Sequence, residues 1–91
     1  MFDATHYPTI PPYTIHALNL WATEGHPPGG FVTAVLKNDL RSAVWAADPD
    51  NAKSLCDIVR YAINELPSAC WGSPERVASW PDRLTSIVTT S

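Results

Sequence analysis

The residues best suited to bind a ligand follow one another at a predicted helix start, in the string Trp71-Gly72-Ser73-Pro74-Glu75-Arg76. Ser73 followed by proline is a typical helix cap, and a helix start presents free N–H groups and a partial positive charge. Gly72 would let a ligand approach the backbone, while Ser73 offers a hydroxyl and Arg76 a cation within one turn. Trp71 could stack on a base. These four residues predict a site for a phosphate-bearing nucleotide.

A second helix start supplies further candidates for the same site. Gly29 and Gly30 follow two prolines and open a predicted helix over residues 30–47. Asp39 lies on that helix about 60° from its apolar direction, where a carboxylate needs a partner. It either contacts the ligand, caps another helix or accepts N–H groups from the loop near Trp71. Alternatively, these residues have structural roles only: the glycines form a turn, Trp71 packs in the core, and Ser73-Pro74-Glu75 caps a helix.

Two aromatic residues of the same predicted helix point away from its apolar stripe. Phe31 and Trp45 lie opposite the stripe, which consists of Val32, Leu36, Leu40, Ala43 and Ala47. An exposed aromatic stripe is typical of a contact with another subunit. We therefore expect Phe31 and Trp45 to form a homo-oligomer interface, unless the N-terminal segment of the same chain covers them.

Catalytic and metal-binding patterns are missing from the sequence. It contains no G-x-S-x-G string, no P-loop and no H-E-x-x-H, and His6, His16 and His26 are isolated from one another. Cys56 and Cys70 are too few for a disulfide framework and are expected to be reduced, buried thiols. We expect a protein that is not an enzyme and that uses no metal and no cofactor.

Composition limits the remaining classes of function. The 91 residues are 45% hydrophobic and carry a net charge of -3, which predicts one small domain. Six basic residues are scattered singly, so double-stranded nucleic acid is not an expected partner. No run is long and apolar enough for a membrane span, and the first residues do not resemble a signal peptide. A cytoplasmic protein with no membrane contact is expected.

The pattern of caps and breakers predicts an all-α fold, a compact domain of four or five helices. Residues 1–13 form an extended proline-rich arm, either an ordered wrap or a tether, and residues 14–91 form one helical domain. Helices are expected over residues 14–24 with Thr14 as N-cap, over 30–47, and over 49–66 after the Asp48-Pro49 start signal. A fourth begins at Pro74, and Pro81 should kink or split it.

The helix over residues 49–66 is predicted to bury one continuous apolar face. That face lies within about 60° of one direction. It comprises Ala52, Leu55, Cys56, Val59, Ala62, Ile63 and Leu66. Tyr61 is placed on the opposite, polar side.

Three strings together resemble a group of small uncharacterised proteins of bacteriophages and prophages. They are Gly29-Gly30-Phe31, Asn38-Asp39-Leu40 and Cys70-Trp71-Gly72-Ser73-Pro74, within a resemblance that spans about residues 25–80. The resemblance implies a phage accessory protein that acts in the cytoplasm of a bacterial host. Small phage proteins of this size include sponges that sequester the nucleotide signals of CBASS or Thoeris immunity, and anti-CRISPR proteins that block an effector by surface contact.

Three functions follow from these observations. The first is a phage anti-defence sponge that binds a phosphate-bearing signalling nucleotide without cleaving it, through Gly29, Gly30, Asp39 and the residues from Trp71 to Arg76. The second is an inhibitor that blocks a bacterial defence protein by direct contact, for which the acidic balance is weak support. The third is a small oligomeric accessory module, with Phe31 and Trp45 at its interface.

Overall fold

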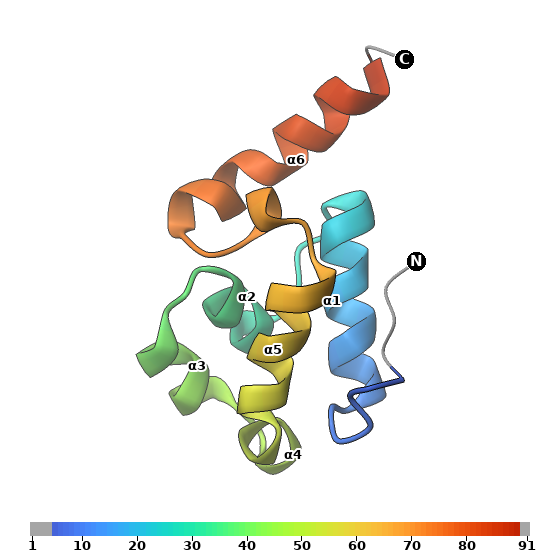
Figure 1. The fold of residues 1–91 in the computed structure, drawn as a ribbon. Coiled ribbons are helices and arrows are strands. Elements are labelled where there is room, and N and C mark those ends of the chain that lie inside the picture. Colours follow the sequence, from blue (N-terminus) through green and yellow to red (C-terminus); the bar gives the residue numbers. More distant parts are fainter. Residues whose placement is uncertain (1–4, 90–91) are drawn as a thin grey trace.

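Helices make up all the regular secondary structure of residues 5–89 in the computed structural model, which confirms the all-α prediction (Figure 1). Backbone is described for these residues and side chains for residues 5–85. The helices are α1 (Pro12–Glu24), α2 (Gly30–Leu36), α3 (Leu40–Ala46), α4 (Pro49–Lys53), α5 (Leu55–Glu65), the 3-10 turn η1 (Ser68–Cys70) and α6 (Pro74–Thr89). There are six α-helices instead of four or five because two predicted helices each divide in two.

Helix α5 lies between α1 on one side and α2 and α3 on the other (Figure 1). Its inward face consists of Ile58, Tyr61 and Ala62, which are fully buried. The prediction that Tyr61 belongs to the polar side was wrong. Tyrosine can occupy the core when its hydroxyl finds a partner, and the Tyr61 hydroxyl donates a 2.6 Å hydrogen bond to Oδ1 of Asn19 on α1.

The predicted helix over residues 30–47 is broken at Asn38, which has a φ of 61°. Asparagine tolerates this left-handed conformation better than most residues. The Asn38 and Asp39 N–H groups donate back to the carbonyls of Val35 and Ala34 and close α2. Asp39 then caps the start of α3.

This break overturns two expectations about side chains. Leu40, placed in the core stripe by a continuous helix, is 66% exposed, because the turn at Asn38 changes the direction in which α3 presents its faces. Phe31, expected on the surface, is buried within the domain. Trp45 is exposed, as expected.

A second break, at Ser54, divides the predicted helix over residues 49–66 into α4 and α5. The buried Ser54 donates its hydroxyl to the carbonyl of Asp50 and so bonds to the preceding turn instead of continuing the apolar face. Ala52 and Ile63 are exposed, contrary to prediction. A wheel drawn for one straight helix does not apply across such a break.

The two cysteines differ in their surroundings. Cys70 is fully buried, and this burial raises the pKa of its thiol to about 11. Cys56 is exposed on α5, so the expectation of two buried thiols was wrong for this residue. Both thiols are free, as predicted.

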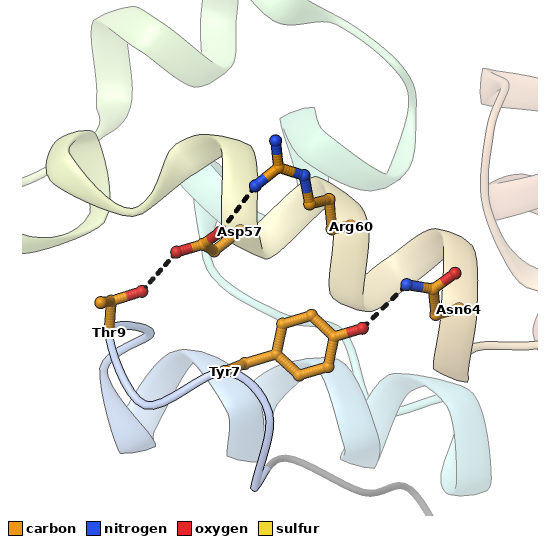
Figure 2. A network of polar contacts seen from close by, with 5 residues as sticks. All are labelled: Tyr7, Thr9, Asp57, Arg60 and Asn64. Atoms are coloured by element: carbon orange, nitrogen blue, oxygen red, sulfur yellow. Dashed lines mark hydrogen bonds and ion pairs between the residues drawn. The ribbon is translucent and has the colours of Figure 1, made fainter.

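Residues 5–11 of the predicted arm form turns that lie against α5 instead of an extended segment (Figure 2). The Tyr7 ring meets the Tyr61 ring edge-on, with centroids 5.2 Å apart. Asn64 donates a 2.9 Å hydrogen bond to the Tyr7 hydroxyl, and Thr9 donates a 2.5 Å hydrogen bond to Asp57. These contacts make this part of the arm an ordered wrap; residues 1–4 of the predicted arm lie outside the described residues.

Helix α1 begins at Pro12, so Thr14 is not its N-cap. Proline is tolerated in the first helical turn because the N–H that it lacks has no helical partner there. Thr14 is instead buried one turn into the helix, where its hydroxyl donates a 2.6 Å hydrogen bond to Oδ1 of the buried Asn51. This bond joins α1 to α4.

Helix α6 runs across one end of the other helices, and its second half extends away from them (Figure 1). It continues through Pro81, so of the two expected outcomes, a kink or a division into two helices, the division does not occur. The Trp80 indole N–H joins the first half of α6 to α1 by donating to the carbonyl of Trp21, and the Trp21 indole N–H joins α1 to η1 by donating to the carbonyl of Cys70. Both tryptophans are buried.

Replacing Thr14 by valine tests the buried link between α1 and α4. Valine nearly preserves the shape of threonine but leaves Oδ1 of Asn51 without its donor, so we expect a loss of about 1–3 kcal/mol in the free energy of unfolding. Urea unfolding followed by circular dichroism measures the change. Thr23→Val is the matched control, because the exposed Thr23 hydroxyl bonds only to the backbone of its own helix. Equal effects of the two substitutions would contradict the argument.

Candidate functional site

Three of the five exposed large apolar side chains of the described residues gather on one short helix, α3, at the edge of the domain opposite α1 (Figure 1). Trp45 is 92% exposed, Leu40 66% and Val44 58%. Arg41 lies one helical turn before Trp45 on the same side. We call these four residues, Leu40, Arg41, Val44 and Trp45, the α3 face. Contiguous exposed apolar surface of this kind marks interaction sites.

Local sequence explains why α3 presents this face to solvent. Ala43 is the one buried residue of α3, and its small side chain permits a close approach to the rest of the domain. Asp39 caps the helix by accepting the Ser42 N–H at 3.2 Å. At the other end the chain is extended at Ala47, and Asp48 caps α4. A helix bounded on both sides in this way is held in place at its ends while most of its surface stays open.

Two of the predicted ligand residues lie beside the α3 face. Gly30 and Asp39 line an open hollow together with Ser42, Trp45 and Ala46. Gly29 precedes Gly30, and the φ of Gly29 is an ordinary -68°. No described atom lies within 4 Å of the position that a Cβ would take at either glycine, apart from adjacent backbone. Neither a positive φ nor crowding therefore requires glycine here, although glycine is favoured at the N-cap position that Gly29 occupies.

Asp39 is exposed and not half-buried as predicted. Its hydrogen bond with Ser42 is the main cause that lowers its pKa, and the positive charges of Arg41 and Lys37 act in the same direction. The carboxylate therefore stays ionised at neutral pH. Of the alternatives for this residue, the structure shows a cap, but of the helix that Asp39 itself begins.

The loop from Trp71 to Arg76 is tied closely to its own surroundings. The Gly72 N–H donates a 2.6 Å hydrogen bond to the Leu36 carbonyl at the end of α2, and the φ of 109° at Gly72 favours glycine. Ser73 accepts the Arg76 N–H and caps α6. Trp71 is half-buried against the core.

The guanidinium of Arg76 also bonds within this loop. Its Nη1 donates to the Ser68 carbonyl at 3.2 Å and to the Trp71 carbonyl at 3.4 Å. The same atom would lie 3.2 Å from a Cβ at Gly72. Some of the N–H groups of Arg76 that were expected to bind a phosphate therefore stabilise the loop instead. Arg76 also lines a separate hollow at the start of α6.

The predicted ligand residues line three different hollows. Gly30 and Asp39 belong to the hollow beside Trp45, whereas Trp71 lines a narrow crevice between α3 and α5 that Asp39 also borders. Arg76 lines a hollow at the start of α6, with Ser68, Glu75, Ser79 and Arg83. The chain therefore brings the candidates near one another in pairs without collecting them around one cavity.

Three side chains of these surfaces were not singled out from the sequence. Leu40 was assigned to the core and Val44 to no site, because a helix continuous through Asn38 hides the α3 face. Arg83 follows Arg76 by seven residues, a spacing that places both on one side of a helix. That signal was present, but it depends on α6 continuing through Pro81, where a kink or a division was expected.

Comparison with known proteins gives no match: no protein-family model, curated protein or solved structure matches this chain. Among the described residues, no group of three or more His, Cys, Asp or Glu side chains is placed to hold a metal ion. None of the helices in the described part of the chain is long and apolar enough to span a membrane.

A hydrogen bond between α1 and the corner after α3 helps to position that corner. The Tyr13 hydroxyl donates to the Asp48 carboxylate at 2.6 Å, while Asp48 also accepts the Asn51 N–H at 2.8 Å. This bond to Asp48 raises the pKa of Tyr13 to about 12, and the bond from Tyr13 lowers the pKa of Asp48. Each shift favours the protonated tyrosine beside the ionised carboxylate.

The raised pKa of Tyr13 predicts a loss of stability at alkaline pH. The contribution of this group is complete below pH 10, the ordinary value for tyrosine, and disappears as the pH rises through about 12. We therefore expect the difference in urea midpoint between the wild type and Tyr13→Phe to be constant near neutral pH and to shrink above about pH 10. Parallel midpoint curves across the alkaline range would show that the bond does not form in solution.

Proposed function

We propose that the protein is a non-enzymatic binding module that acts by direct contact with another protein chain through the α3 face. The observation that carries this proposal is Trp45, a tryptophan 92% exposed on a helix that is held at both ends and that also exposes Leu40 and Val44. Tryptophan and arginine are the residues most enriched at the energetic centres of protein interfaces, and Arg41 lies beside Trp45. Such a function needs no catalytic side chain.

The free energy expected from burying the α3 face supports a protein partner. An aromatic side chain buries about 150–250 Å² at an interface, which corresponds to about 4–6 kcal/mol before the costs of association. A small polar ligand would leave most of the α3 face exposed, since the face is apolar except for Arg41. The sequence resemblance implies a phage protein that acts in the bacterial cytoplasm. There, contact through the α3 face would either block a host defence protein or assemble an accessory module.

Photo-crosslinking in living bacteria tests the contact. A photoreactive amino acid at Ser42, which is exposed on α3, should join the chain covalently to a partner protein. Trp45→Ala should remove the product, because the substitution deletes the main contact without disturbing buried structure. Ile63→Ala is the matched control: it truncates another apolar side chain, 62% exposed, on α5. Absence of any protein product, or equal yields from the two variants, would reject the α3 face as the functional surface.

A second candidate function, the nucleotide sponge, is favoured by a different observation. Two guanidinium groups, from Arg76 and Arg83, line one hollow with the side chains of Ser68 and Ser79. Arginine and serine together suit phosphate, and Trp71 lies on the loop that Arg76 holds. Glu75 also borders the hollow and opposes an anion there. The proposed ligand is a phosphate-bearing signalling nucleotide, bound without cleavage.

Thermal unfolding against a panel of cyclic dinucleotides, cyclic trinucleotides and ADP-ribose compounds tests the sponge. A ligand at 100 times its Kd stabilises the folded state by about 2.7 kcal/mol, which shifts the midpoint of so small a domain by several degrees. Arg83→Ala should abolish the shift, whereas Arg60→Ala, an exposed arginine on α5, should keep it. A panel without any shift would eliminate this candidate.

A further inference from the structure

We infer that the protein which covers the α3 face is a second copy of this chain, related to the first by a two-fold axis. The inference rests on the proposed function and names its partner. In this dimer, Trp45 of each copy lies over the Gly29–Gly30 surface of the other.

The shape of the surface provides both halves of a reciprocal contact. A two-fold interface uses the same patch on both subunits, so a side chain that projects from the patch must find its recess on that patch. Trp45 is the projection, and it borders the same hollow as Gly30. No described atom lies within 4 Å of a Cβ position at Gly30, which leaves room for a ring against the bare backbone.

A second copy also accounts for the glycine at position 30. Gly29 is the N-cap of α2, a position that favours glycine, whereas Gly30 is needed neither for a positive φ nor for internal packing. A side chain at Gly30 would instead occupy the hollow that Trp45 of the other copy enters. Close approach to a bare backbone is one of the uses of glycine at contacts, and here the approaching group must come from outside the chain.

The charges around α3 suit a copy better than a strongly charged partner. Residues 37–53 contain three basic and three acidic side chains, so the segment has no net charge to repel its own copy. The basic residues are Lys37, Arg41 and Lys53, and the acidic ones are Asp39, Asp48 and Asp50. Arg41 lies on the α3 face, and the carboxylates of Asp39 and Asp48 lie at the two ends of α3, so each copy offers the other groups of both signs.

The limited area of the patch sets the expected strength of the dimer. Helix α3 has seven residues, a length of about 10 Å, so the contact falls in the class that buries less than about 1,200 Å² in total. Interfaces of that class are weak. We therefore expect a reversible monomer–dimer equilibrium that depends on concentration, with monomers in dilute solution.

Analytical ultracentrifugation over a concentration series from about 5 to 500 µM tests the inference by mass action. The average mass of the wild type should rise towards twice the 10.0 kDa of one chain. Trp45→Ala should weaken the dimer at least tenfold, and Ile63→Ala should leave it unchanged. A wild type that stays monomeric throughout, or a dimer that survives Trp45→Ala, overturns the inference.

Gly30→Ala gives a second test that separates folding from association. The added methyl group enters open space in the single chain, so thermal stability of the dilute protein should be kept or raised. The same methyl group lies where the other copy's Trp45 must fit, and the dimer should weaken at least fivefold. A dimer unaffected by Gly30→Ala overturns the reciprocal contact.

The crosslinking experiment distinguishes failure of this inference from failure of the proposed function. A Ser42 product of twice the chain mass, lost in Trp45→Ala, supports both. A Trp45-dependent product with a different protein, together with a monomeric purified chain, overturns the dimer and keeps the α3 face as the functional surface. No crosslinked protein and no dimer overturn both.

Discussion

The turn at Asn38 and the cap that follows it are the constraint on which the exposed surface of this protein depends. The left-handed Asn38 ends α2, and the Asp39 carboxylate begins α3 through the Ser42 N–H. Because each helical residue advances by about 100°, a helix that stops and restarts presents different side chains to its neighbours. One consequence is that Leu40 and Trp45 share an exposed face.

The end of α2 also fixes the loop that leads into α6. The Leu36 carbonyl, left without a helical partner at that end, accepts the Gly72 N–H, and Ser73 and Arg76 are placed from there. Both candidate surfaces therefore depend on the end of α2. The α3 face follows this end directly in the chain, and the loop from Trp71 to Arg76 is attached to it by the hydrogen bond from Gly72 to Leu36. They nevertheless face different hollows, which is why a protein contact and an anion site are separable hypotheses.

A binding role agrees with how the polar groups of the described chain are used. The carboxylates of Asp39 and Asp48 cap helices, Arg76 bonds to loop carbonyls, and the hydroxyl of Thr14 joins two helices. Among the described residues, no buried side-chain nitrogen or oxygen lacks a hydrogen-bond partner. The α3 face, by contrast, is mostly apolar and exposed, with Gly30 beside it in the same hollow.

The sequence by itself determined the features that depend on a few neighbouring residues. The Asp48-Pro49 and Ser73-Pro74 starts, the end of α5 before Pro67 and the all-α class could be predicted because caps and prolines act locally. Of the candidate site residues, Trp45 is exposed as expected, although the expectation came from a wheel for a continuous helix that the structure does not contain. Tertiary structure decided which faces of the helices are buried. Tyr61 lies in the core because its hydroxyl reaches Asn19 on α1, and Phe31 is buried because α2 is enclosed by the rest of the domain. The break at Asn38 rotates the face on which Leu40 lies, so its exposure could not be read from a wheel for one continuous helix.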